Sequence, residues 1–569
     1  PYYLESGLPD WLVPKDVDAV ITMWHGLSAG QGIPWGVWIG PITAYSIFFI
    51  AQILIFAYTV YLLTGPQWVE MERVVYPNTA PTVYQIVTWG KRDEQGKSQL
   101  FNLRVTTTKI FWICVIIGLL ISMPSYGNII APFYWMQYLY GGYGGGLCMF
   151  RINLHPFTQH VLPGWLFSST FYLGSALWLV LCPWSTIISM IAVWFVFRGL
   201  LPFILVKAGI FPMTTPGLWG WGLGWQKPFP YMILFIGAAY GLGFWYIWQL
   251  RGRFKVIFEA LKGKTIIHRG LNVRYASMIY ALLIVIWLIW WIVVGLHPVQ
   301  AILGFIVYMA WCLAAGRVWA ENGPWGLECT SPCWQIIWPV GAGLGLYNWM
   351  PPNTGRYAYA MAVCRAAYDS CLSWNNDPCS LGGTGAMYKV LYENKVHLGK
   401  ALSIFTIFVI IMIPIYLVID VYLSYHMGYV NLGPQGTLTP WNHASIALDS
   451  GIRSLSYPGG FDLNYYLTWV LAGAVLGVVM AWMRATFAWF IFNPIFFAAA
   501  GSAIWWWLQA VVAAIIKLVL TRALGARRAE EVILPVVAGV LTGAGLLYLI
   551  GGIYAWVNGV IPNVTINWR

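Results

Sequence analysis

Charged residues at the ends of apolar segments are the side chains of this sequence best placed to carry chemistry. They are Glu70, Glu72 and Arg73 after the first long apolar segment, and Arg317 and Glu321 after a later one. Ionisable groups at membrane depth are costly unless paired or hydrated, so these residues are candidates for the pathway of a solute or an ion. At helical spacing, Arg317 can pair with Glu321, and Glu70 with Arg73. The structural alternative for Arg317 and Glu321 is an ion pair at the membrane interface. For Glu70 and Arg73 it is a solvated helix end.

Arg484 and Asn493 extend this set of pathway candidates toward the C-terminus, where the chain must fold back. A single helix over 485–521 would have 37 residues and span about 55 Å, nearly twice a hydrocarbon core of about 30 Å. The natural breaks are at Asn493-Pro494 and at Gly501. Irregular backbone at membrane depth must face protein or a water-filled cavity. We therefore expect the earlier Arg-Glu pair to contact this folded-back segment or to be paired internally.

The sequence predicts no catalytic residue, no metal site, no cofactor and no enzymatic activity. All eight histidines lie in loops or at the ends of apolar segments, whereas a haem-binding subunit needs axial ligands within its spans. Cys329 with Cys333 and Cys371 with Cys379 are local pairs whose spacing fits no standard zinc pattern. They can form disulfides in an oxidising compartment and remain thiols in the cytoplasm. The segment GKRDEQGKS at 90–98 lacks the spacing of a phosphate-binding loop.

The composition identifies lipid as the solvent of this chain. Of its 569 residues, 59% are hydrophobic and 9% are charged, against about 25% charged residues in soluble proteins. The 36 Trp and 34 Tyr residues suit the aromatic belts at the two membrane interfaces. Basic residues retained in cytoplasmic loops explain the net charge of +12, so we expect no nucleic-acid partner.

The apolar segments predict an all-α fold, a polytopic transmembrane helix bundle with about twelve crossings. Broken or re-entrant segments are expected near 317–352 and 485–502. The basic loops 65–109 and 251–275 fall on one side, which the positive-inside rule makes cytoplasmic. Both termini are therefore expected outside, in a multi-pass protein of the plasma membrane. The expected crossings are 37–64, 109–123, 165–182, 183–206, 231–250, 276–296, 299–316, 400–423, 464–483, 485–500, 503–521 and 532–557.

Four regions follow from this topology. Residues 1–36 form an extracytoplasmic N-terminal segment with a short interfacial helix, and residues 37–399 form an N-terminal membrane domain. Residues 400–557 form a C-terminal membrane domain, and 558–569 an extracytoplasmic tail. The tail carries Asn563 in the only N-x-S/T sequon, a glycosylation site if the host has the machinery.

Three motifs resemble those of a known family. GIPWGVWIGPITAYSIFFIAQILIFAYTVYLLTGPQWVEMERVVYPNTAP at 32–81, GRVWAENGPW at 316–325 and the segment 492–528 are similar to motifs of a prokaryotic family of polytopic membrane proteins of unknown function. That family is distantly similar to oligopeptide-type transporters, a likeness of fold that assigns no substrate. One departure is Asn493, where the family usually has a histidine before the proline.

Two functions are open from the sequence. The first is a secondary transporter or permease for a small solute, with a binding cavity between broken helices. The second is a structural or accessory subunit of a membrane complex that transports nothing itself. The expected partners are membrane lipids, a small solute or coupling ion, and either further copies of this chain or other subunits of a membrane complex.

Overall fold

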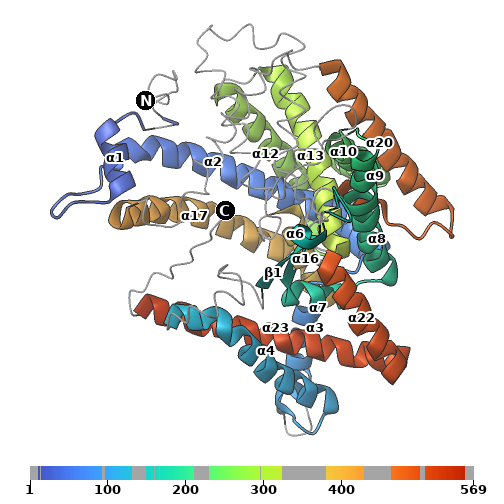
Figure 1. Ribbon diagram of the computed structural model, residues 1–569. Helices are drawn as coiled ribbons and strands as arrows, with labels where there is room; N and C mark the ends of the chain where they lie inside the picture. Colours follow the sequence, from blue (N-terminus) through green and yellow to red (C-terminus); the bar gives the residue numbers. More distant parts are fainter. Residues whose placement is uncertain are drawn as a thin grey trace.

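The computed structural model is a helical assembly with two short β-hairpins (Figure 1). It describes most of the chain. The described residues are 11–12, 14–92, 96–130, 149–158, 160–165, 167–210, 230–294, 297–322, 380–428, 463–499 and 507–557.

Within these ranges, nine helices are long and apolar enough to cross a membrane, or ten if one bent pair counts as a span. The bent pair is α10 (Tyr231–Gln249) with α11 (Arg251–Leu261), which meet at 50°. The nine are α2 (Trp35–Thr59) with η1 (Val60–Met71), α4 (Thr106–Ile130), α8 (Trp184–Trp194) with η3 (Phe195–Leu200) and α9 (Leu201–Lys207), α12 (Val273–Val294), α13 (Pro298–Asn322), α17 (Leu398–Met427), α20 (Leu463–Thr486), α22 (Trp507–Leu524) and α23 (Ala526–Val557). The chain is a multi-pass, predominantly helical integral membrane protein.

Two of the expected crossings, 165–182 and 485–500, are not long helices in the part of the chain that the structure describes. In 165–182, the aromatic and hydroxyl residues of β2 (Ser168–Tyr172) pair with β1 (Met149–Asn153), and only α7 (Leu173–Leu181) is helical. The aromatic and β-branched side chains of this stretch favour the strand.

The expected crossing 485–500, where a broken segment was also expected, is not one long helix. Helix α20 ends at Thr486, and the next helix, α21 (Pro494–Ala498), has five residues. The break expected near 317–352 is absent over 317–322, because α13 continues without interruption to Asn322. The rest of that segment, 323–352, lies outside the described residues, as do 500–502.

Glycines allow two pairs of spans to approach closely. In the α10–α20 glycine contact, a Cβ added at Gly237 would lie 2.1 Å from the carbonyl oxygen of Val470, and one added at Gly473 would lie 2.1 Å from that of Leu234. Glycines of α4 and α23 meet the facing backbone in the same way, and Figure 1 shows these two helices side by side. Small residues of this kind let membrane helices pack without a hydrophobic driving force.

The first helix, α1 (Val17–His25), lies where an interfacial helix was expected. Asp16 caps its N-terminus, and the Tyr425 hydroxyl of α17 donates to the carbonyl oxygen of Ala19. Its apolar residues Val17 and Ile21 are exposed, as an interfacial helix requires. Its position relative to a membrane stays a prediction.

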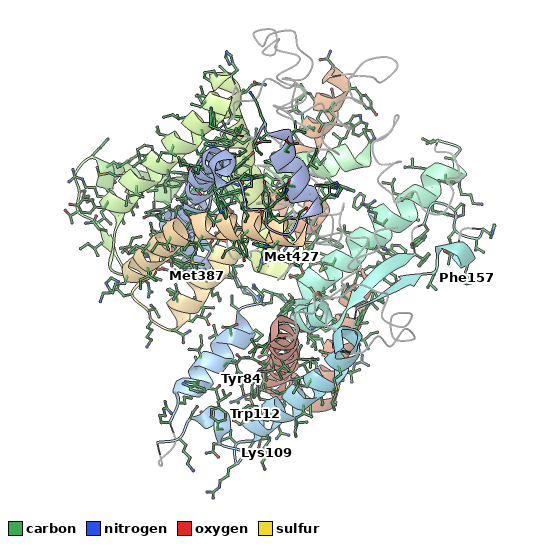
Figure 2. All side chains as sticks on the ribbon, turned by 90° about the vertical axis from the view of Figure 1, so that its left-hand side faces the viewer. Tyr84, Lys109, Trp112, Phe157, Met387 and Met427 are labelled. Atoms are coloured by element: carbon green, nitrogen blue, oxygen red, sulfur yellow. The ribbon has the colours of Figure 1, made fainter. Side chains whose placement is uncertain are left out.

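Two further elements complete the frame around the candidate site. The hairpin of β3 (Ile267–His268) and β4 (Leu271–Asn272) precedes α12, and α16 (Leu381–Glu393) precedes α17. α3 (Ala80–Gly90), η2 (Gln99–Phe101) and α4 form a lower body with Tyr84 and Trp112, below Met387 and Met427 in Figure 2. The division into two membrane domains at residue 400 stays a prediction. Two helices after that residue pack against helices before it, α20 against α10 and α23 against α4.

The contacts between spans give the relative directions of several helices. Trp38 donates to Tyr425 and Tyr58 lies 3.5 Å from Thr406, so α2 and α17 are antiparallel. In the α10–α20 and α4–α23 pairs, residue numbers rise together along both helices, so each pair is parallel. These directions are the ones that the expected topology requires, whereas the side on which the termini lie stays a prediction.

Candidate functional site

Glu321 lies where four parts of the chain meet. Its Oε1 is 2.7 Å from Arg317 Nε of the same helix, and its Oε2 is 3.7 Å from Arg484 Nη1 at the end of α20. Asn493 Nδ2, at the start of α21, donates to Glu321 Oε2. Arg317 also donates through Nη1 to Glu72, directly after η1. We call these five residues the Glu321 cluster.

The sequence explains why these side chains converge. Arg317 and Glu321 share one face of α13 because they are four residues apart. The Asn493 side chain accepts a bond from the Ile495 N–H and so caps α21, whose first residue is Pro494. Asparagine at the N-cap and proline at the first helical position are both favoured. The capping bond thus fixes the orientation of the Asn493 side-chain amide, whose Nδ2 donates to Glu321.

Burial makes the Glu321 cluster strongly coupled. The side chains of Arg317 and Glu321 are 14% and 13% exposed, and the Arg317 guanidinium lies 5.4 Å from the ring of Trp68 and 5.6 Å from that of Tyr246. Two carboxylates face two guanidiniums, so the charges balance. Removing one partner would leave an uncompensated charge in a poorly hydrated place, which is strongly unfavourable.

A second cluster forms around Glu70. Glu70 Oε1 lies 3.0 Å from His268 Nε2 and 3.4 Å from Arg269 Nε, both of the β3–β4 hairpin, and it accepts a bond of 2.6 Å from the Tyr388 hydroxyl of α16. Burial, followed by the hydrogen bond to Glu70, raises the pKa of Tyr388, so this phenol remains a donor at any physiological pH. We call these four residues the Glu70 cluster.

The pairing of Glu70 with Arg73 that the sequence allows is not formed. The helix does not extend to Arg73, which is exposed and has a left-handed backbone with φ of 53°. Glu70 turns instead to residues about 200 and 300 positions away. By contrast, the expected pair of Arg317 and Glu321 is present, with the expected contact to the folded-back segment through Asn493. A role of any of these residues in a pathway stays a prediction.

The π-helix η1 connects the two clusters. It has twelve residues, contains Gly65 and Pro66, and ends one residue before Glu72. Three of its polar atoms are buried without a hydrogen-bond partner, the hydroxyls of Tyr61 and Thr64 and the indole N–H of Trp68. π-Helices are rare and frequent at functional sites, and such polar atoms are suited to binding water or a polar solute.

A family of unknown function (DUF6785) matches residues 3–132 and 214–567. The chain belongs to this family. No curated protein matched the chain, and no solved structure matched it. The three motifs that carried the resemblance lie within the matched residues, whereas the kinship with oligopeptide-type transporters stays an expectation.

The matched residues of this DUF6785 protein include both clusters. Glu70 and Glu72 lie in the first matched range, and Arg317, Glu321 and Asn493 in the second. The unmatched range 133–213 contains both strands of the first hairpin and the helices α7, α8 and α9. The family match therefore covers the candidate site and omits one flank of it.

Sequence reasoning missed several residues of this DUF6785 protein. Arg198 is fully buried within η3, in the middle of a span, and an arginine inside an apolar segment was the available signal. Gly65-Pro66 inside the first apolar segment was a signal for irregular helix at η1. Tyr388 and His268 gave no local signal, because their contacts with Glu70 come from distant parts of the chain.

The remaining candidates cannot be placed in the structure. Cys329, Cys333, Cys371, Cys379 and Asn563 lie outside the described residues. Among the described residues, Cys114, Cys182 and Cys312 are buried. The same residues contain no group of three or more His, Cys, Asp or Glu side chains suited to a metal ion.

Proposed function

We propose that this protein is a secondary transporter or permease for a small solute, and that the Glu321 cluster is its inner gate. The observation that carries the proposal is that the buried carboxylate of Glu321 in α13 contacts both Arg484 at the end of α20 and Asn493 at the start of the short helix α21. Broken helices at protein-facing positions are where transporters build their binding sites. The positive-inside rule supports a cytoplasmic location for this gate, with both termini outside.

The bonding of Arg317 supports a gate that can open at moderate cost. If the end of α20 and the start of α21 move away, Arg484 and Asn493 leave Glu321. Arg317 then still binds both Glu321 and Glu72, so neither carboxylate is left alone. The departing Arg484 is 35% exposed and can hydrate. A two-state element of this kind is what alternating access requires.

The proposal is tested by the accessibility of Ser189, whose Oγ accepts a bond of 2.8 Å from the Asn493 N–H. A cysteine at 189 is exposed to an impermeant maleimide in inverted membrane vesicles, with and without imposed proton or sodium gradients. A moving gate gives a labelling rate that depends on the gradient, and Glu321→Gln abolishes that dependence. A cysteine at Ser98, buried in the loop before η2, is the control. No labelling of residue 189 under any gradient would contradict the gate.

The alternative is a structural or accessory subunit of a membrane complex. It is favoured by the pairing of Glu72, Arg317 and Glu321, each of which has an opposite charge within hydrogen-bond distance. In that case Glu321→Gln lowers the thermal stability, and no gradient changes the labelling of residue 189. The same pair of measurements thus separates the two functions.

A further inference from the structure

One face of α11 differs from the rest of the helix in both charge and exposure. Arg251, Lys255, Phe258 and Lys262 are all exposed and recur at intervals of four, three and four residues, which places them on one helix face. The opposite face, with Ile257 and Ala260, is buried against the bundle. We call this exposed set, together with Trp248 at the end of α10, the α11 face.

Large aromatic side chains are exposed among these cations. Phe258 is 62% exposed and Trp248 is 61% exposed, and the Arg251 guanidinium lies 4.7 Å from the Trp248 ring. The single acidic residue of α11, Glu259, is paired with Lys264 at 3.0 Å, so it does not neutralise the face. Aromatic residues interspersed with Lys and Arg are the composition of helices that lie in a membrane interface.

The position of α11 between two spans argues for a location of this face at the membrane surface. α11 follows the span α10 after a single residue and bends away from it by 50°. The chain returns to the membrane with α12 only eleven residues after α11 ends. A helix held between two spans in this way lies along the interface rather than in the aqueous phase.

We propose that the α11 face binds the headgroups of anionic phospholipids in the adjacent leaflet. The three cations provide complementary charge for the phosphates, and basic residues beside a span are attracted to anionic lipid surfaces. Phe258 and Trp248 enter the boundary between headgroups and acyl chains. This binding concerns a surface separate from the Glu321 cluster, and it holds for a transporter and for an accessory subunit alike.

The test measures lipid binding to the full-length protein in an uncharged detergent. Native mass spectrometry compares phosphatidylglycerol with phosphatidylcholine of the same acyl chains, for the wild type and for the triple variant R251Q/K255Q/K262Q. The matched control K91Q/R104Q/K109Q removes three exposed cations between the end of α3 and the first turn of α4. Thermal unfolding without lipid confirms that each variant is folded.

We expect the wild type to prefer phosphatidylglycerol, and the α11 triple variant to bind it about fivefold more weakly for each charge removed. The control variant and Phe101→Ser should retain wild-type binding, whereas Phe258→Ser should weaken it. Equal weakening by both triple variants would mean that only net charge matters and would overturn the proposal. So would the absence of a preference for the anionic lipid, or full displacement of the lipid by inorganic phosphate.

Discussion

Helix α20 is attached to the rest of the protein in two chemically different ways. Along its length, Gly473 and Gly477 touch the backbone of α10, and at its end Arg484 reaches Glu321. The glycine contact joins backbone to backbone and has no side chain that can adjust. The Glu321 cluster is made of long side chains with alternative partners, close to the end of the span. Motion of α20 is therefore expected at its charged end, with the glycine contact as the fixed part.

The largest effect should come from breaking the glycine contact. Gly237→Leu places a Cβ 2.1 Å from the Val470 carbonyl oxygen, and backbone cannot yield as a side chain can. Overpacking costs typically about 1–3 kcal/mol, and this substitution should exceed that range and prevent recovery of monodisperse protein. Gly545→Leu in α23, where a Cβ would meet nothing within 4 Å, is the control. Size-exclusion chromatography of both variants is the measurement. Similar recovery of the two would show that the approach of α10 and α20 is not tight.

A smaller loss is expected from the Glu321 cluster. Glu321→Gln leaves Arg317 and Arg484 without their shared carboxylate, but Arg317 keeps Glu72. We expect a loss of about 2–3 kcal/mol in the free energy of unfolding. This is less than the roughly 3–5 kcal/mol lost when one partner of an isolated buried ion pair is removed. Thermal or denaturant unfolding in detergent measures it. A double-mutant cycle with Glu72→Gln should show strong coupling, and simple additivity would argue against a shared Arg317.

Asn493 should contribute less, through two separable roles. Asn493→Ala removes both the cap of α21 and the donor to Glu321, and loss of a cap alone costs about 1 kcal/mol. Asn493→Ser keeps a capping oxygen and loses the donor, so its stability should lie between those of the wild type and the alanine variant. The comparison is made by thermal unfolding. A serine variant as unstable as the alanine variant would show that the cap contributes nothing.

The smallest effect should come from the Glu70 cluster. Tyr388→Phe removes the hydroxyl that donates to Glu70, while the contacts of Glu70 with His268 and Arg269 remain. The expected loss is about 1 kcal/mol, the net value of a single hydrogen bond. Arg527→Gln removes an exposed ion pair with Glu531. It should leave the unfolding temperature unchanged and is the control for Tyr388→Phe. A loss at Tyr388 as large as that of Glu321→Gln would remove the distinction between the two clusters.

The sequence predicted what depends on local spacing and composition, and failed where distant segments meet. The membrane class, ten of the expected spans and the Arg317–Glu321 pair follow from hydrophobic runs and from four-residue spacing. The strand at 168–172 was missed because its five residues directly precede the apolar segment 173–181, and only their pairing with 149–153 distinguishes them from the start of that helix. The partners of Glu70 could not be found because they lie about 200 and 300 residues away. Arg73 was assigned to a helix face because nothing local revealed its positive φ.

The π-helix η1 makes this protein sensitive to a kind of change that substitutions do not test. Glu70 and Glu72 are two residues apart and face different clusters, so the register of η1 determines which carboxylate meets which partner. Each hydrogen bond of a π-helix spans one more residue than that of an α-helix. Deleting a single residue between Tyr61 and Pro66 would change this register and rotate everything that follows relative to α2. Both carboxylates would lose their partners at once, although every side chain involved would still be present.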